Sequence, residues 1–157
     1  MRARIVPATA AHAEAIAANV READRLELWA SSRSEPLDVI LRGMESTPEP
    51  LTALYDGEPA CVFGAWPFSI MGGMAAAWMV GSRVLERPGA QRDLLRLSRP
   101  VVDYWQAQYP ALLYNFVDAR NASAIRWLRW LGFQFDDPIP YGVDGLPFLP
   151  FYKRKVP

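Results

Sequence analysis

The stretch NASAIRWLRWLGF, residues 121–133, decides how the chain is interpreted. It opens with an asparagine, which caps helix starts well, and its apolar residues recur at helical spacing. Gly132 suits the left-handed residue that ends a helix. The pattern therefore predicts a helix over residues 121–131. The free N–H groups at its start favour an anionic or carbonyl-rich ligand beside Asn121, although a core helix with two caps explains the same residues.

The segments on either side of this helix predict strands and one long helix. ALLYNFVD (111–118) is typical of a buried strand, and FQFDD and LPFLPFYKR supply two late strands. The prolines of the last strand are typical of a sheet edge. Gly89 precedes a long helical pattern whose apolar face continues across Pro100, so we expect a kinked but continuous helix there.

The first half of the chain changes period after three predicted helices, the first of which has Thr9 as its cap. The expected elements are a strand at Arg2–Val6, helices from Ala10 to about Asn19, within 21–32 and from Pro36 to about Glu45, a hairpin of 51–56 and 59–66 joined by Asp56-Gly57, and a strand at Met74–Val80. This order predicts a mixed α/β fold in a single domain over residues 1–157, with a parallel crossover late in the chain.

Composition limits the functions and cofactors that are open to the chain. Its 157 residues are 51% hydrophobic and carry 17 basic and 17 acidic residues, so charge gives no reason to expect nucleic acid or an anionic membrane as partner. Cys61 is the only cysteine and His12 the only histidine, which excludes an internal disulfide and a zinc site, and no metal is expected.

The sequence also argues against secretion and against a membrane span. The Ala-rich N-terminus is interrupted by His12 and Glu14, unlike a signal peptide. Residues 59–82 contain no charge and are long enough to cross a bilayer. Their prolines and glycines divide them into short pieces, so two buried strands around a turn explain them better than a transmembrane helix.

The late half of the chain resembles the GNAT fold, the family of acetyl-CoA-dependent N-acetyltransferases. The family pattern is a buried strand, then Asn-x-x-Ala, an apolar helix face, and Leu-Gly-Phe before the next strand. The residues that match it are Asn121, Ala124, Ile125, Leu131, Gly132 and Phe133. The resemblance implies a GNAT-like acyl-CoA N-acyltransferase fold, with a mixed central sheet flanked by helices.

A narrower resemblance concerns GNAT-like proteins of tailed bacteriophages. READRLELWA, VFGAWP and YNFVDARNASAIRWLRWLGF, followed by GLPFLPF, are similar to the podovirus internal virion protein A group. Its members share the fold, mostly without proven activity. This resemblance implies a phage-encoded protein, located in the host cytoplasm during infection or in the virion.

The GNAT resemblance also implies where acetyl-CoA would bind. The backbone of Met79, Val80 and Gly81 would hold the pantetheine arm. Gly89 and Ala90 would meet the pyrophosphate, and Asn121 the cofactor at the next helix start.

The phosphate-binding loop departs from the family pattern. The segment VGSRVLERPGAQRD has no spacing that satisfies Gln/Arg-x-x-Gly-x-Gly/Ala, and Pro88 removes one N–H donor. The side chains of Arg83, Arg87 and Arg92 offer a substitute, although Pro88-Gly89 also serves simply to start a helix.

An acyl transfer to an amine needs a base for the amine and an acid for the leaving thiolate. Many GNAT enzymes place a Tyr four residues after the Ala of the motif, where this chain has Leu128, which reads as core. The candidate bases are Glu27 and Asp24, with Glu22 nearby, on a helix that often lines the acceptor site in this fold. Their alternative is a solvated helix face, with Leu26 and Trp29 on its apolar side.

Two further features leave alternatives open. Tyr114 and Asp118 are on a strand that borders the predicted site, but alternation does not say which of them faces it. Trp127 and Trp130 either form an adhesive surface together with Arg126 and Arg129, or pack under neighbouring strands.

Two functions follow. One is N-acylation of a small-molecule or protein amine from acetyl-CoA. The other is a catalytically inactive domain that binds other virion or host proteins.

Overall fold

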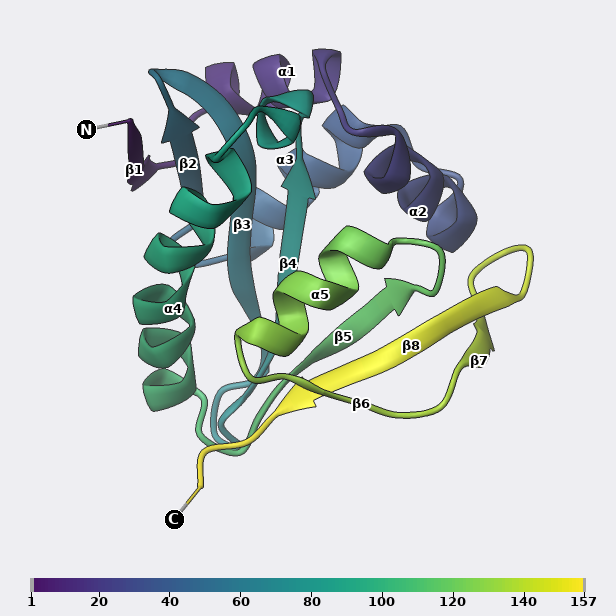
Figure 1. The fold of residues 1–157 in the computed structure, drawn as a ribbon. Helices are drawn as coiled ribbons and strands as arrows, with labels where there is room; N and C mark the ends of the chain where they lie inside the picture. Colours follow the sequence, from purple (N-terminus) through teal and green to yellow (C-terminus); the bar gives the residue numbers. More distant parts are fainter. Residues whose placement is uncertain (1, 157) are drawn as a thin grey trace.

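A computed structural model describes residues 2–156 of the chain (Figure 1). Within these residues, an eight-stranded mixed sheet carries five α-helices and one short 3-10 helix. The elements in chain order are β1 (Ala3–Pro7), α1 (Ala10–Ala18), α2 (Glu22–Ser32), α3 (Pro36–Ser46), β2 (Leu51–Tyr55), β3 (Glu58–Ser69), β4 (Met74–Gly81), η1 (Arg83–Glu86), α4 (Ala90–Gln108), β5 (Leu112–Asp118), α5 (Ala122–Trp130), β6 (Gln134–Phe135), β7 (Ile139–Tyr141) and β8 (Leu146–Lys153).

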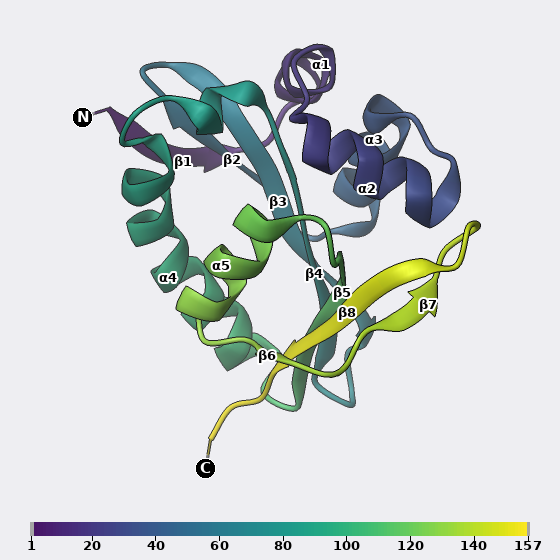
Figure 2. The ribbon, with the colours of Figure 1, turned by 45° about the vertical axis from the view of Figure 1, so that its right-hand side comes forward.

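Helices cover both faces of the sheet. Its strand order is β1-β2-β3-β4-β5-β8-β6, with β7 also paired to β8. Figures 1 and 2 show α4 and α5 on one face, and α1, α2 and α3 on the other. The larger core lies beneath α4 and α5, whereas a smaller one joins α1 and α3 to β3 and β4. The predicted α/β fold with a mixed central sheet flanked by helices is confirmed.

β4 and β5 run parallel but pair only at their first residues. The ladder joins Met74–Ala76 to 112–114. Beyond it, β4 continues to Gly81 and β5 to Asp118 without pairing with each other. The last link is made by the side chain of Asn115, which donates from Nδ2 to the carbonyl oxygen of Ala77 at 2.9 Å. The two strands therefore diverge towards their carboxyl ends (Figure 1). This divergence opens the middle of the sheet.

Most predicted elements are present close to their expected bounds. Thr9 caps α1, and His12 takes part in the cap by accepting from the Thr9 N–H through Nδ1 at 3.2 Å. Asp56 and Gly57 both have positive φ, as a two-residue hairpin turn requires. The uncharged segment 59–82 forms β3 and β4, and no helix within residues 2–156 has the length and apolar character to cross a membrane. α4 continues through Pro100 without a break.

The prediction that the last strand lies at a sheet edge is wrong. β8 pairs with β5 on one side and with β6 and β7 on the other, and β7 itself was not expected. The two prolines of β8 occupy places where no ladder donor is needed. Pro147 lies opposite Ala119, just past the end of β5, and Pro150 lies between the stretches paired with β6 and β7.

The structure decides between the two alternatives for α2, because Leu26 and Trp29 do not form its inward side. Leu26 and Trp29 are 38% and 43% exposed, whereas Asp24 and Ala30 are buried. The inward face is polar because Asp24 finds buried partners at the end of β4, described below. Trp29 is partly covered by the guanidinium of Arg33, 5.2 Å from the centre of its ring.

The two tryptophans of α5 have different environments, so the expectation that both pack under strands holds for one of them. Trp127 is buried in the larger core. Trp130 is exposed, and Arg99 of α4 stacks over it at 4.3 Å and donates to its carbonyl oxygen. Arg99 thereby ties the end of α5 to α4.

Candidate functional site

A cavity of about 640 Å³ passes through the gap between β4 and β5. One of its ends lies against α4 and α5, with Val101, Trp105, Ala124 and Leu128 in the wall. The other end lies against α2 and α3, with Glu27, Leu28, Val39 and Gly43 in the wall. Its volume is in the range of small-molecule sites. Leu128 is half-buried and packs against the larger core, as predicted.

The backbone of β4 presents an open edge to this cavity. Ala77 and Gly81 direct their peptide groups towards β5, since Ala77 accepts from Asn115 while Gly81 donates to Asp24 and accepts from the Arg21 N–H. The two-residue period of a strand places the N–H and C=O of Met79 on the same edge. β5 no longer pairs there, so this edge is open to an extended ligand.

A buried polar bridge closes the gap at the carboxyl ends of the two strands. Asp24 accepts from the Gly81 N–H at 2.7 Å through Oδ2, and Arg21 donates to Ser123 Oγ at 2.8 Å and to Asn121 Oδ1 at 3.1 Å. The Arg21 and Asp24 side chains lie 3.6 Å apart and are both buried. We call Arg21, Asp24, Asn121 and Ser123 the polar bridge. It connects the start of α2 to β4 and to the start of α5.

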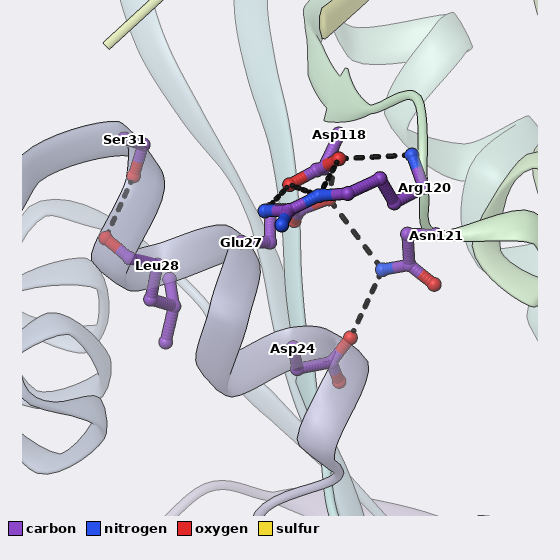
Figure 3. A network of polar contacts seen from close by, with 7 residues as sticks. All are labelled: Asp24, Glu27, Leu28, Ser31, Asp118, Arg120 and Asn121. Atoms are coloured by element: carbon purple, nitrogen blue, oxygen red, sulfur yellow. Dashed lines mark hydrogen bonds and ion pairs between the residues drawn. The ribbon is translucent and has the colours of Figure 1, made fainter. Parts of the chain in front are cut away.

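Asn121 uses its side-chain amide entirely within the protein. Its Oδ1 also accepts from the Ala124 N–H at 3.4 Å, which caps α5. Its Nδ2 donates to Asp24 Oδ1 at 3.2 Å and to Glu27 Oε1 at 3.4 Å (Figure 3). The two donors and two acceptor positions of the amide are thus taken.

Glu27 is an ionisable group of the cavity wall with a strongly raised pKa. Its Oε1 accepts from the Asp118 N–H at 2.8 Å, which attaches α2 to the end of β5. Burial raises the pKa of Glu27 to about 8, with a smaller contribution from the negative charge of Asp24, while the bonds from Asp118 and Asn121 oppose the rise. A carboxyl that titrates near neutrality is suited to accept a proton from an amine.

Asp24 and Glu22 differ from Glu27 in what they offer. Burial raises the pKa of Asp24, against the effects of Arg21, the Gly81 N–H and Asn121, but both of its oxygens are engaged in the polar bridge. Glu22 is exposed and paired with Arg25. The alternative of a solvated face therefore describes Glu22 and is wrong for Asp24 and Glu27.

The loop after β4 uses its N–H groups internally. The donors that bind protein acceptors are the amides of Ser82, Arg83, Val84, Leu85, Arg87 and Ala90. Gly89 caps α4 with a φ of +79°, and Ala90 is buried behind it. Arg83, Arg87 and Arg92 are all exposed, with Arg87 paired to Glu58 and Arg92 to Asp93. The amides of residues 82–85 and of Arg87 and Ala90 are thus not available to cradle a phosphate.

The structure separates the predicted residues into two groups. Met79, Val80, Asp24, Glu27 and Asn121 all line the cavity. Gly81, Gly89 and Ala90 are not among the lining residues of the cavity. Gly81 ends β4, and the other two lie at the start of α4.

The two undecided residues of β5 are resolved by the structure. Tyr114 packs between the rings of Phe68 and Phe116 and is not among the lining residues. Burial opposes ionisation of Asp118, yet hydrogen bonds from the side chain and backbone of Arg120 lower the pKa of Asp118 below its ordinary value. Asp118 therefore reaches Glu27 through its backbone and not through its carboxylate.

Two contributors to the site were not predicted. Arg21 precedes a helix with Asp24 three residues later, a spacing that pairs charges on one face, yet nothing in the sequence shows that this pair is buried. Tyr141 lies in β7, which has only three residues and was not expected.

Several solved structures similar to this one are named as acetyltransferases. The ribosomal-protein-alanine N-acetyltransferase from Brucella melitensis has a TM-score of 0.69 at 19% identity, covering 96% of this chain and 99% of that one. The ribosomal L7/L12 alpha-N-protein acetyltransferase in complex with coenzyme A has a TM-score of 0.70 at 11% identity, covering 99% and 95%. The chain has the GNAT fold. A GNAT-family acetyltransferase from Streptococcus pneumoniae, with a TM-score of 0.64, 14% identity and coverage of 98% and 99%, agrees.

These identities are low enough that the likeness concerns the fold alone. No protein-family model matches the chain, and no curated protein matches its sequence. The function must therefore be argued from the site.

Proposed function

We propose that the chain is an N-acyltransferase that transfers an acetyl group from acetyl-CoA to an amine, as a single domain over residues 1–157. The observation that carries this proposal is the cavity through the sheet, in which the open edge of Met79 and the carboxyl of Glu27 both lie. The GNAT neighbours support it, and one of them is named as a complex with coenzyme A.

The residues proposed for the cofactor fit it unequally. The Met79 edge suits the amides of a pantetheine arm, with Val80 beside it. The Gly81 N–H and the Asn121 side chain would have to give up their hydrogen bonds in the polar bridge before they could bind the cofactor. The pyrophosphate would lie near Gly89 and Ala90 at the start of α4, held more by exposed arginine side chains than by loop amides.

Acetyl-CoA would supply an acyl group activated as a thioester. Glu27 would accept the proton of the acceptor ammonium, leaving a neutral amine next to the Met79 edge. Asn121 and the Asp118 N–H hold the carboxyl of Glu27 in place, so they act as positioning groups. In the net reaction a C–N bond forms, the C–S bond breaks, and the leaving thiolate takes the proton that the acylated nitrogen loses, since Leu128 has no proton to give.

Calorimetric titration with acetyl-CoA, followed by an assay of thiol release with an amine acceptor, tests the proposal. The chain suits a thiol-reagent assay because Cys61 is buried, and burial raises the pKa of its thiol to about 12. Binding followed by amine-dependent thiol release is the expected result. Absence of binding at millimolar acetyl-CoA would overturn it.

A second candidate is a catalytically inactive GNAT-fold domain of a bacteriophage, used in the virion or to bind a host protein. The closed polar bridge and the internally bonded loop after β4 favour it, because both oppose cofactor entry. Mass spectrometry of purified virions tests it, provided the gene is assigned to a phage. Failure to find the chain there, together with acetyl-CoA turnover, would exclude it.

A further inference from the structure

We propose that the acceptor is a small primary amine carried on an aromatic ring. This inference rests on the proposed acyl transfer and specifies its second substrate. It comes from the half of the cavity that faces α2 and α3. Five aromatic side chains line that half, which we call the aromatic slot: Trp66, Trp78, Phe116, Tyr141 and Phe148.

The rings of the slot come from different strands, and four of them are held in place by their neighbours. Phe116 and Tyr141 stack with centroids 4.3 Å apart and planes at 22°, and Tyr141 lies 5.1 Å from Phe148. Trp78 donates from Nε1 to Thr47 Oγ1 at 2.8 Å. Its ring packs so closely on α3 that a Cβ at Gly43 would lie 3.0 Å from it. The slot therefore has preformed aromatic walls that suit a flat apolar group.

Glu27 lies at the inner end of this slot. The Asp118 N–H that binds Glu27 Oε1 is only two residues beyond Phe116 on β5. An ammonium placed beside Glu27 would also lie near aromatic faces, which attract cations. A ring with a short aminoalkyl chain fits both features, with its ring between the walls and its nitrogen at the carboxyl.

The charges in the cavity wall favour a single amine. The acidic and basic lining residues are Asp24, Glu27, Arg42 and Glu45. The oxygens of Asp24 are already bonded, Arg42 donates to Ser34 Oγ and the Asp38 carbonyl, and Glu45 is at the exposed rim. One carboxyl thus remains for the ligand inside the slot. The further charges of a polyamine would find no second carboxylate inside the slot, and contact with aromatic faces alone would offset only part of their desolvation cost.

Binding to the full chain without acetyl-CoA tests the slot by itself. The probes are 2-phenylethylamine, 2-phenylethanol, which lacks the amine, and spermidine, which lacks the ring. Tryptophan fluorescence is a suitable readout because Trp66 and Trp78 line the slot, with thermal shift as a second readout. We expect 2-phenylethylamine to bind at least about tenfold more tightly than either comparison compound. Equal or tighter binding of spermidine would overturn the inference.

Two substitutions locate the binding. Tyr141→Leu should weaken 2-phenylethylamine binding by about fivefold or more, and Tyr152→Leu should leave it unchanged, because Tyr152 is also half-buried but lies outside the cavity wall. If Tyr141→Leu does not fold, Trp66→Ala at the half-exposed mouth serves instead, with the same expected loss. Unchanged binding in a folded slot variant would contradict the inference.

Combining this test with acetyl-CoA separates two kinds of failure. Acetylation of spermidine or of a peptide with an N-terminal alanine, in preference to 2-phenylethylamine, would leave the acyltransferase proposal standing and overturn the aromatic acceptor. Binding of 2-phenylethylamine to a chain that does not bind acetyl-CoA would retain the slot and overturn the acyl transfer. Preferred acetylation of 2-phenylethylamine supports both.

Discussion

Two parts of the cavity wall are constructed differently. On the side of α2 and α3, aromatic rings and the Glu27 carboxyl line the aromatic slot. At the carboxyl ends of β4 and β5, where the proposed cofactor would enter, the polar bridge joins Gly81 to Asp24 and Arg21 to α5. The side proposed for the acceptor is thus preformed, whereas the side proposed for the cofactor is occupied by the protein's own hydrogen bonds.

This difference shows that the GNAT fold alone does not decide whether the chain is active. The divergence of β4 and β5 provides the space, and Glu27 is the proposed base. Activity then depends on whether the cofactor can displace the polar bridge at a tolerable free-energy cost. Each of the following predictions tests one end of the cavity or the helix, α2, that contributes to both.

The largest effect is expected at Glu27. Glu27→Gln should lower kcat by about a hundredfold or more, because a positioned general base contributes roughly 10²–10⁴ to the rate. The Gln amide can still accept from the Asp118 N–H, so acetyl-CoA affinity should change less than twofold. Steady-state kinetics and calorimetry measure the two effects. A variant with wild-type kcat would show that another group takes the proton.

The next effect concerns the polar bridge. Arg21→Ala and Asp24→Ala should each lower the free energy of unfolding by about 3 kcal/mol, because each leaves the other charge buried without its partner. Urea denaturation measures this. A double variant, Arg21→Met with Asp24→Leu, should recover much of the loss, since apolar replacement of a buried pair is often neutral.

The same double variant also compares the two proposed functions. If the bridge competes with the cofactor, removing it should tighten acetyl-CoA binding severalfold in calorimetry. Weaker binding would mean that Arg21 or Asp24 contacts the cofactor directly.

Stability should depend on pH through Glu27. Its pKa is raised from an ordinary 4.5 to about 8 in the folded state, so the native protein binds more protons than the unfolded chain between these values. The free energy of unfolding should therefore fall as pH rises, by roughly 1–3 kcal/mol between pH 5 and 8, a range that allows for partial solvent access to the carboxyl.

Urea titrations at pH 6, 7, 8 and 9 measure this dependence, with Glu27→Gln as the comparison. Because Gln does not ionise, the variant should lose most of the slope and be more stable than the wild type at pH 9. Asp24 remains in both proteins, so its raised pKa cancels from the comparison. Parallel curves for the two proteins would show that Glu27 titrates normally.

The sequence was sufficient to predict the fold because its signals are local. Asn121, Gly132 and the apolar spacing between them predict α5, and the Asp56-Gly57 turn predicts the hairpin of β2 and β3. β7 was missed because a three-residue strand has no measurable period. β8 was misplaced because its prolines fall at gaps in the ladders, which depend on distant strands.

The site was less predictable because its chemistry depends on tertiary contacts. Asp24 and Glu27 look like part of a charged helix face, and only the approach of Gly81 and Asp118 shows that they are withdrawn from solvent. Asn121 was predicted to cap α5 and does so, but its bonds to Arg21, Asp24 and Glu27 join segments about a hundred residues apart. No local pattern encodes such contacts.

The smallest effect is expected on the outer face of α2. Leu26→Gln should change the free energy of unfolding by less than about 0.5 kcal/mol, because Leu26 is already exposed. Ala30→Gln, on the same helix but buried, should cost about 1–3 kcal/mol by overpacking. Urea denaturation of the two variants determines which face of α2 is turned inward. A larger loss for Leu26→Gln would mean that the opposite face of α2 is turned inward. Asp24 and Glu27 would then face solvent, away from the cavity.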